Sequence, residues 1–287
     1  MLVNLLAKRK FFIQIFIIVL FLLLGATNFN SINLSVLEII GVVLLLLTVL
    51  FVGYTDNSND LISVSSYPAF LYILWLMPFV EGLTDYRIAG SLLLITYITT
   101  KLLYFESEKN DYFNAFDIGL FTSFAILLNP PLIFLGIMVF TYFLTLRTVE
   151  PKVPILGFLG FLVPVLIIAQ ISFLMDYYFM FDFYRVQLLP MMIHFELKQL
   201  FLIPLIIILI ISLVHYLKNS NKFSAQKKRM FFLIHLMFFT SLITFVFYGG
   251  NNDTYLAFLA FNAMIMLANY FSESKPKIEW FKEALLW

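Results

Sequence analysis

Four charged side chains in one aromatic-rich stretch are the strongest candidates for chemistry in this sequence. They are Asp176, Asp182, Arg185 and Glu196. Carboxylates interleaved with a guanidinium group can bind a cation or a phosphate, or can act as acid and base toward a lipid-linked substrate. The alternative interpretation is that these charges are simply solvated at the protein surface. The elements on either side of the stretch decide where the four side chains lie.

Histidine and cysteine, the usual soft metal ligands, do not form a recognisable metal site. The chain has no cysteine, which excludes thiolate ligands and disulfides. His194 and His215 are 21 residues apart, which is about 31 Å along a helix. His215 and His235 can approach one another from neighbouring helices, but no HxxxH or HxxHH spacing accompanies them. We therefore predict no metal and no cofactor, and we interpret the histidines as hydrogen-bonding residues.

No motif of a common catalytic class is present. The chain lacks a glycine-rich phosphate loop, a nucleophile elbow and an HExxH pair, which argues against an ATPase or a metalloprotease. The polar residues inside the apolar stretches are Gln14, Gln170, Asn262 and Asn269. Their default role is hydrogen bonding between helices, and the alternative is a substrate pathway along the helix face that Asn262 and Asn269 share.

The composition excludes an ordinary soluble protein. Of the 287 residues, 62% are apolar and 12% are charged, whereas a soluble domain has about 45 to 50% apolar and about 25% charged residues. Lysine and arginine number 18 against 17 acidic residues, a net charge of +1. This balance gives no basic surface for nucleic acid. The partner that the composition predicts is the lipid bilayer.

The apolar residues fall in blocks long enough to cross a membrane as helices. Their length and the absence of two-residue alternation predict an all-α polytopic transmembrane helix bundle with about ten spans. The N-terminus has the basic flank of a signal peptide without a cleavage site, and we interpret it as a retained first span. The predicted spans are at about 11–26, 36–54, 64–80, 88–104, 114–128, 132–146, 154–175, 199–217, 230–248 and 254–270.

The distribution of basic residues decides between ten spans and nine. The doubtful region is 113–146, which is either two short helices broken at Asn129-Pro130-Pro131 or one kinked helix. Ten spans with a cytoplasmic N-terminus place fifteen basic residues inside and three outside, whereas fusing the pair gives seven inside and eleven outside. The positive-inside rule favours ten spans. We therefore expect a multi-pass protein of the bacterial inner membrane with both termini in the cytoplasm.

Two segments lie outside the spanning pattern. Asp176 to Phe195 alternates aromatic and charged residues, as expected for a segment at the outer interface, with a lid over a site as the alternative. Lys275 to Trp287 has the pattern of a short amphipathic helix on the cytoplasmic surface, with docking of a protein partner as the alternative. The domain organisation is thus a single transmembrane domain over residues 1–274 and a cytoplasmic amphipathic tail over 275–287.

Several short motifs resemble those of an uncharacterised bacterial family of polytopic inner-membrane proteins, known as a domain of unknown function. Some members of that family carry a transferred beta-carotene monooxygenase label. Membrane carotene oxygenases bind iron through several histidines, and the three histidines here do not offer such a set. The resemblance therefore implies the fold and the membrane but not this activity. The motifs are Lys8-Arg9-Lys10, Asn57-Ser58-Asn59-Asp60, Phe113-Asn114-Ala115-Phe116-Asp117 and Asn129-Pro130.

The short paired helices also resemble the core of membrane glycosyltransferases that use polyprenyl-phosphate sugars. That family has a catalytic carboxylate in its first outer loop, and the corresponding residues 27–33 contain none. The nearest acid is Glu38, already in the second span. We therefore expect a non-enzymatic scaffold or subunit of an envelope assembly or transport system. The alternatives are a lipid-linked enzyme of the glycosyltransferase type and a small-solute transporter.

Overall fold

The computed structural model of this chain describes residues 35–55, 67–105, 111–145, 151–174, 184–189, 203–219, 221, 223–250 and 252–273. No strand occurs in these ranges, so the predicted all-α class is confirmed for them. The predicted span 11–26, the loop 57–60 and the tail 275–287 lie outside the described residues.

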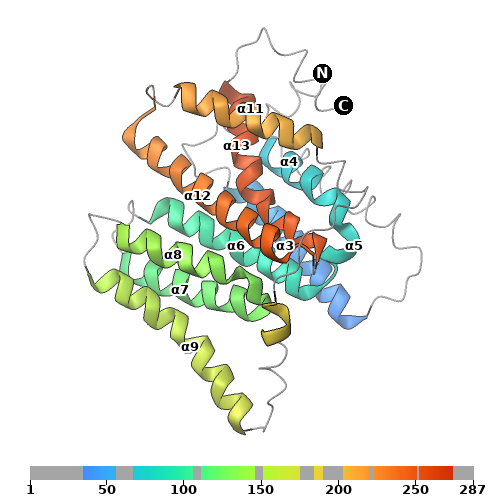
Figure 1. Ribbon diagram of the computed structural model, residues 1–287, viewed down its shortest axis with the longest axis vertical. Coiled ribbons are helices and arrows are strands. Elements are labelled where there is room, and N and C mark those ends of the chain that lie inside the picture. The colour runs from blue at the N-terminus through green and yellow to red at the C-terminus, as the bar shows by residue number, and fades with distance from the viewer. Residues whose placement is uncertain are drawn as a thin grey trace.

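The described helices follow the predicted spans closely (Figure 1). Their bounds are α3 Val36–Thr55, α4 Tyr67–Leu76, η1 Met77–Phe79, α5 Val80–Leu83, α6 Tyr86–Tyr104, α7 Asp111–Leu128, η2 Pro130–Leu132, α8 Ile133–Thr145, α9 Lys152–Leu174, α11 Ile203–Asn219, α12 Ala225–Tyr248, η5 Asp253–Leu259 and α13 Ala260–Glu273.

Three of the four prolines inside predicted spans lie where a helix starts or breaks. Pro68 and Pro204 are the second residues of α4 and α11, where a missing N–H costs no hydrogen bond. Pro78 lies in η1 and interrupts the predicted span 64–80, which the structure divides into α4, η1 and α5. The helix α9 continues through Pro164.

The region 113–146 consists of two helices, as the distribution of basic residues predicts. The helix α7 ends at Leu128, Asn129 takes an extended conformation, and α8 begins after the short turn η2. The two helices fold back on one another, since Ala115 near the start of α7 and Phe143 near the end of α8 both lie against Gly157 of α9. The Asn129-Pro130-Pro131 motif is therefore a turn and not a kink.

The last described helix forms the centre of the bundle. Every residue from Thr254 to Phe271 is buried, and α13 packs against α4, α11 and α12. The side chain of Trp75 in α4 donates a hydrogen bond to the carbonyl of Leu256 at 3.1 Å. An apolar helix with no exposed face must be surrounded by other helices, and η5 with α13 occupies that position.

The helix α9 lies at the edge of the bundle. It packs mainly against α7 and projects beyond its neighbours in Figure 1. Gly119 of α7 and Gly157 and Gly160 of α9 allow the two backbones to approach closely, as small residues do between membrane helices. Its other faces are apolar and exposed, including Phe158 and Ile167 at 50% each.

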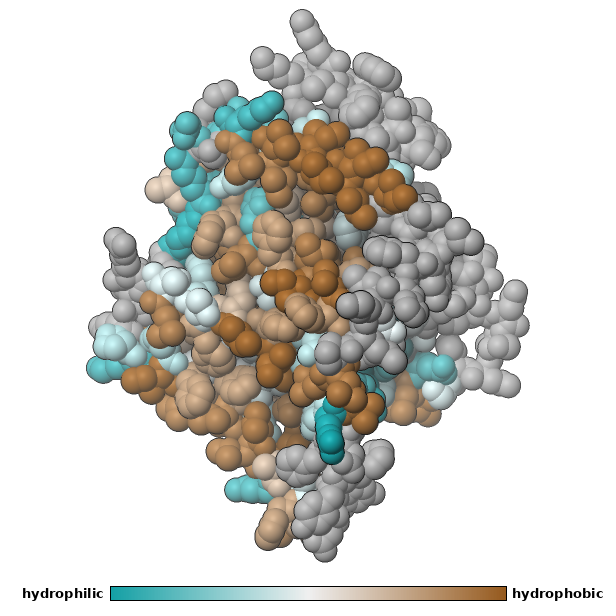
Figure 2. All heavy atoms as spheres, in the orientation of Figure 1, coloured by the Kyte–Doolittle hydropathy of each residue, from teal (hydrophilic) through white to brown (hydrophobic). Residues whose placement is uncertain are grey.

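The described surface is largely apolar. Figure 2 shows hydrophobic residues over most of the visible face, with hydrophilic atoms gathered at its edges. Within the described ranges, four helices are long and apolar enough to cross a membrane, namely Val36–Gly53, Lys152–Leu174, Ala225–Tyr248 and Asp253–Phe271. Such a surface is stable against hydrocarbon and not against water, so the structure supports a membrane protein.

Candidate functional site

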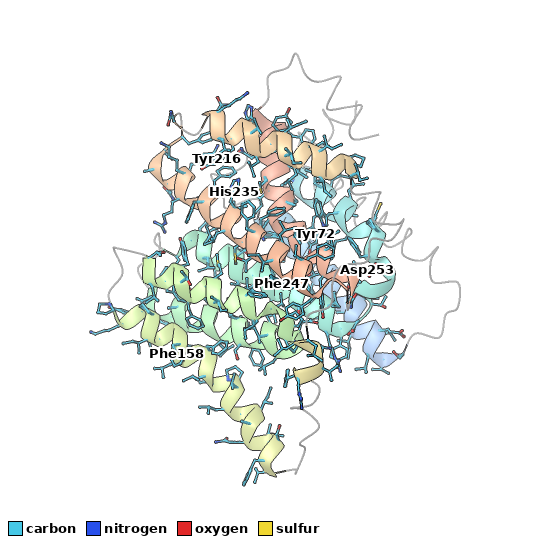
Figure 3. All side chains as sticks on the ribbon, in the orientation of Figure 1. Tyr72, Phe158, Tyr216, His235, Phe247 and Asp253 are labelled. Carbon is cyan, nitrogen blue, oxygen red and sulfur yellow. The ribbon has the colours of Figure 1, made fainter. Side chains whose placement is uncertain are left out.

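Several loops that the sequence assigns to the outer face meet at one end of the bundle. This end contains the start of α3, the α5–α6 turn and the start of η5. Asp253 marks it in Figure 3, and Tyr216 and His235 lie toward the other end of α12. The α7–α8 turn joins it because the amide nitrogen of Asn129 donates to the carbonyl of Arg87 at 2.8 Å and to the hydroxyl of Ser91 at 2.6 Å.

A polar pocket of about 340 Å³ is the first candidate site at this end. Its lining includes the carboxylates of Glu38 and Asp85 and the amide of Asn252, which lie at the starts of three different helices. This composition would suit a cation or acid–base chemistry. Its lining residues are Leu37, Glu38, Gly82, Thr84, Asp85, Tyr86 and Asn252.

Glu38 in this pocket is held in a capping box. Its carboxylate accepts hydrogen bonds from the Ser35 backbone N–H at 2.7 Å and from the Ser35 hydroxyl at 2.9 Å. The Glu38 N–H in turn donates to the Ser35 hydroxyl at 3.3 Å. This reciprocal pattern satisfies donors at the start of α3, so Glu38 has a structural role there.

Asp85 and Asn252 are caps as well. The Asp85 carboxylate accepts from the Arg87 N–H at 2.8 Å at the start of α6. The Asn252 side-chain oxygen accepts from the Thr254 N–H at 3.0 Å and from the Thr254 hydroxyl at 2.6 Å. Three helix N-termini thus meet at the pocket, and each has a capping side chain. The pocket's acids and amide are accounted for by these caps.

No group of three or more His, Asp or Glu residues in the described ranges is placed to hold a metal ion. His215 lies edge-on to Tyr270 with ring centroids 5.4 Å apart. His235 lies beside Tyr216 at 5.1 Å, and its Nδ1 is 2.6 Å from the Phe231 carbonyl. The two histidines are held by different partners, while His194 lies outside the described residues.

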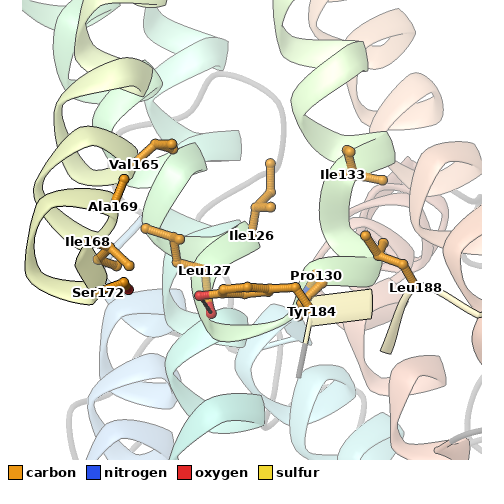
Figure 4. Close-up of a pocket in the computed structure, with 10 residues that line it drawn as sticks. All are labelled: Ile126, Leu127, Pro130, Ile133, Val165, Ile168, Ala169, Ser172, Tyr184 and Leu188. Atoms are coloured by element: carbon orange, nitrogen blue, oxygen red, sulfur yellow. Dashed lines mark hydrogen bonds between the residues drawn. The ribbon is translucent and has the colours of Figure 1, made fainter. Parts of the chain in front are cut away.

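An apolar pocket of about 230 Å³ is the second candidate site (Figure 4). It lies between α7, η2, α8 and α9, and residues of the segment 184–189 line one side of it. Tyr184 crosses this side in Figure 4. The pocket can take hydrocarbon and offers almost no polar atom to a substrate. Its lining residues are Ile126, Leu127, Pro130, Ile133, Val165, Ile168, Ala169, Ser172, Tyr184 and Leu188.

Tyr184 is fixed in place by the α7–α8 turn. Its hydroxyl donates to the carbonyl of Leu127 at 3.3 Å. In a continuing helix that carbonyl would accept from the N–H of residue 131, which is a proline and has none. Burial raises the pKa of Tyr184, and the nearby Arg87 offsets part of this rise. The hydroxyl therefore keeps its proton and remains a donor.

Of the four sequence-predicted candidates, the structure describes Arg185 alone. Arg185 is exposed and does not line either pocket. Asp176, Asp182 and Glu196 lie outside the described residues, so their placement stays a prediction. Of the outer segment, the described part is a helical turn whose Tyr184 and Leu188 cover the apolar pocket.

The polar residues predicted inside spans divide into two kinds. Asn262 and Asn269 are buried in α13, and neither the amide oxygen nor the amide nitrogen of Asn262 has a hydrogen-bond partner among the described residues. Gln170 is exposed on α9, and Gln14 lies outside the described ranges. Sequence reasoning missed Ser91 and Asn252. Asn252 carried a readable signal, because it is an Asx residue two positions before a threonine at a helix start.

Comparison with known proteins gives one match. The model of a family of unknown function, DUF6427, matches residues 1–287. No curated protein and no solved structure matches the chain significantly.

Proposed function

We propose that this chain, which belongs to the DUF6427 family along its whole length, is a non-enzymatic multispanning protein of the bacterial inner membrane. Its role is that of a scaffold or subunit of a cell-envelope assembly or transport system. The observation that carries the proposal is the polar pocket, where Glu38, Asp85 and Asn252 are each engaged in capping a helix. The family description names no carotene oxygenase activity.

The proposed topology has ten spans, with the N-terminus and the C-terminus in the cytoplasm. Two independent observations support it. Fifteen of the eighteen basic residues then face the cytoplasm. The starts of α3, α6 and η5, all assigned to the outer face, line a single pocket.

The same topology places the cytoplasmic ends of neighbouring helices side by side. Lys101 near the end of α6 donates to Asn114 near the start of α7 at 3.0 Å. Arg229 near the start of α12 donates to the Tyr142 hydroxyl near the end of α8 at 3.4 Å. All four residues are assigned to the cytoplasmic side, so their contacts agree with the alternation of the spans.

Partner binding is assigned to two surfaces. One is the tail 275–287, whose apolar residues repeat on one helical face. The other is α9, where Gln170 is exposed among apolar residues. An exposed amide in a membrane helix favours a hydrogen bond with another helix, so α9 offers a position for a partner's span.

The tail is tested by purification of the protein from its native membrane. Replacing Ile278 and Phe281 with serine removes the apolar face, and a stoichiometric protein partner is then expected to be lost. The matched control replaces Glu279 and Glu283 with glutamine, which keeps that face and the partner. Unchanged co-purification with the serine variant, or with a chain ending at residue 274, would count against the scaffold role of the tail.

A lipid-linked enzyme is the second candidate, because the apolar pocket beside Tyr184 can hold part of an isoprenoid chain. Arg87 lies close enough to influence the pKa of Tyr184 and could bind a phosphate there. Alanine at Asp182 and at Arg185 is expected to abolish transfer from a polyprenyl-phosphate sugar without loss of expression. Product formation by both variants would remove this candidate.

A further inference from the structure

A groove between α11 and α12 lies at the opposite end of the molecule from the two candidate sites. It has a volume of about 390 Å³ and is lined by Leu213, Tyr216, Leu217, Phe232, His235, Leu236 and Phe239. These residues repeat at helical spacing on the facing sides of the two helices. Both helices pack against α13, and the groove follows the line where they face one another.

Aromatic rings close one side of the groove. Tyr216 lies 4.9 Å from Phe231 and 5.1 Å from His235 between ring centroids, and Figure 3 shows Tyr216 and His235 beside one another between the two helices. Leu217, Phe232 and Phe239 are 61%, 60% and 48% exposed. The groove is therefore open to hydrocarbon along its length.

His235 has one ring nitrogen beside the groove that is unpaired among the described residues. Its Nδ1 contacts the carbonyl of Phe231 at 2.6 Å, and a carbonyl only accepts, so this nitrogen carries a proton. Its Nε2 is buried and has no hydrogen-bond partner in the described part of the chain. Because Nδ1 holds the proton, Nε2 can only accept a hydrogen bond. It therefore cannot pair with an anion, and the basic side chains at the end of the groove are the groups that can.

The charged residues that α11, α12 and their connection contribute at this end of the groove are all positive. From residue 199 to residue 252 the sequence contains five basic residues and no Asp or Glu. Lys218 ends α11, and Lys227 and Lys228 lie in the first turn of α12, where Lys227 Nζ lies 4.7 Å from the centre of the Phe223 ring. Figure 2 shows the hydrophilic atoms gathered at this junction beside the brown surface of α11.

We propose that this groove is a binding site for an anionic phospholipid. One acyl chain lies along Leu213, Leu217, Phe232, Leu236 and Phe239, and the phosphate lies at Lys218, Lys227 and Lys228. Basic pockets between membrane helices bind acidic head groups in this way. The inference does not depend on the scaffold role, since it concerns a different surface of the molecule.

Native mass spectrometry of the full chain, delipidated in a nonionic detergent, tests the proposal. The probes are dioleoyl phosphatidylglycerol and dioleoyl phosphatidylcholine, which share their acyl chains and differ in net charge. We expect one phosphatidylglycerol to bind about a hundredfold more tightly than phosphatidylcholine, because each of the three lysines near an acidic head group contributes about fivefold. The preference falls when the salt concentration is raised.

Two sets of variants test separately how the lipid head group and the acyl chain contribute to binding. Lys218→Gln, Lys227→Gln and Lys228→Gln together are expected to lower phosphatidylglycerol affinity to that of phosphatidylcholine, whereas Lys152→Gln, an exposed cation at the start of α9, keeps the preference. Leu217→Trp fills the groove and weakens both lipids, and Ile167→Trp on α9 weakens neither. Equal affinity for the two lipids, or an unchanged preference in the triple variant, overturns the proposal. Binding that appears only in a chain ending at residue 274 also overturns it, since the tail would then occupy the groove.

Discussion

Tyr184 shows how one side chain can complete a turn that two prolines leave incomplete. A helix that ends inside a membrane protein has unpaired carbonyl groups in its last turn, and water is not available to pair them. The Tyr184 hydroxyl pairs one of them, that of Leu127. The ring of the same residue forms part of the apolar pocket. A single tyrosine thus links the outer segment to the α7–α8 turn.

Tyr184→Phe removes the hydroxyl and keeps the ring. We expect it to lower the free energy of unfolding by about 1 kcal/mol, measured by thermal melting of the purified protein in detergent. Tyr184→Ala also removes the wall of the pocket and is expected to cost more. Equal stability of wild type and Tyr184→Phe would show that the hydrogen bond to Leu127 contributes nothing.

The raised pKa of Tyr184 adds a dependence on pH. A pKa that is higher in the folded than in the unfolded state gives stability that is complete below the unfolded value, about 10, and is lost as the pH rises through the folded value. The wild type is therefore expected to lose more stability above pH 10 than Tyr184→Phe does. Parallel melting profiles of the two proteins across this range would contradict the assignment.

Unlike the hydroxyl of Tyr184, the buried side-chain amide of Asn262 has no hydrogen-bond partner among the described residues. Removing it is expected to relieve a desolvation cost, so Asn262→Leu should raise the free energy of unfolding by about 1 kcal/mol. The matched control is Asn129→Leu, which removes two hydrogen bonds and should destabilise the protein. If Asn262→Leu instead destabilises the protein by a similar amount, Asn262 has a partner that stabilises the fold.

At the scale of the elements, α7 and α9 pack with their backbones in close contact. A Cβ atom at Gly119 would clash with the backbone of Gly157, and one at Gly160 with the backbone of Phe116. Backbone cannot give way as a side chain can, so Gly119→Ala and Gly160→Ala are each expected to destabilise the protein by about 1 to 3 kcal/mol.

Gly90 in α6 provides the control for that prediction. The nearest atom to its Cβ position is the end of the Leu128 side chain at 3.1 Å. This methyl group can move, so Gly90→Ala is expected to cost clearly less than Gly119→Ala in the same melting experiment. A similar loss in all three variants would mean that the cost does not come from the α7–α9 contact.

The positions of the helices were predictable because a bilayer leaves few alternatives. Long apolar blocks without alternation must be helical, and Asn129-Pro130-Pro131 must interrupt one of them. Pro78 inside the span 64–80 predicts an interrupted helix, as found. The 3₁₀ start of the span 254–270 was missed, since apolar composition says little about local helix geometry. The central position of α13 was also missed, although its span is the least apolar of the four that could cross a membrane.

The candidate site was harder to predict than the helices. Glu38 appeared as the acid nearest to a catalytic position, although Ser35 three residues before it is the signal of a capping box. The pocket beside Tyr184 joins residues from positions 126 to 188, and no local pattern indicates such a contact. Helix caps are readable from spacing, whereas contacts between distant helices require the packed structure.

At the scale of the whole molecule, the two most apolar of the four candidate membrane spans are the least buried, and the least apolar one is the most buried. Every residue from Thr254 to Phe271 is buried, compared with 22% of the α9 window. The exposed apolar area on α9, α3 and α11 faces lipid or the spans of a partner. The charged residues then lie at the two ends of the bundle, so the orientation of the molecule decides which end meets the cytoplasm.

The absence of cysteine allows this orientation to be tested without background labelling. Arg185 lies at the end of the molecule that carries the two candidate pockets, and Asn221 lies between α11 and α12 at the other end. Both residues are exposed, so a cysteine can replace each of them as a labelling site. A maleimide that cannot cross the membrane is expected to label Arg185→Cys in cells whose inner membrane is intact, and Asn221→Cys only after that membrane is permeabilised. The opposite pattern would place the basic α11–α12 junction outside, against the positive-inside rule. It would also place the proposed phospholipid site in the outer leaflet.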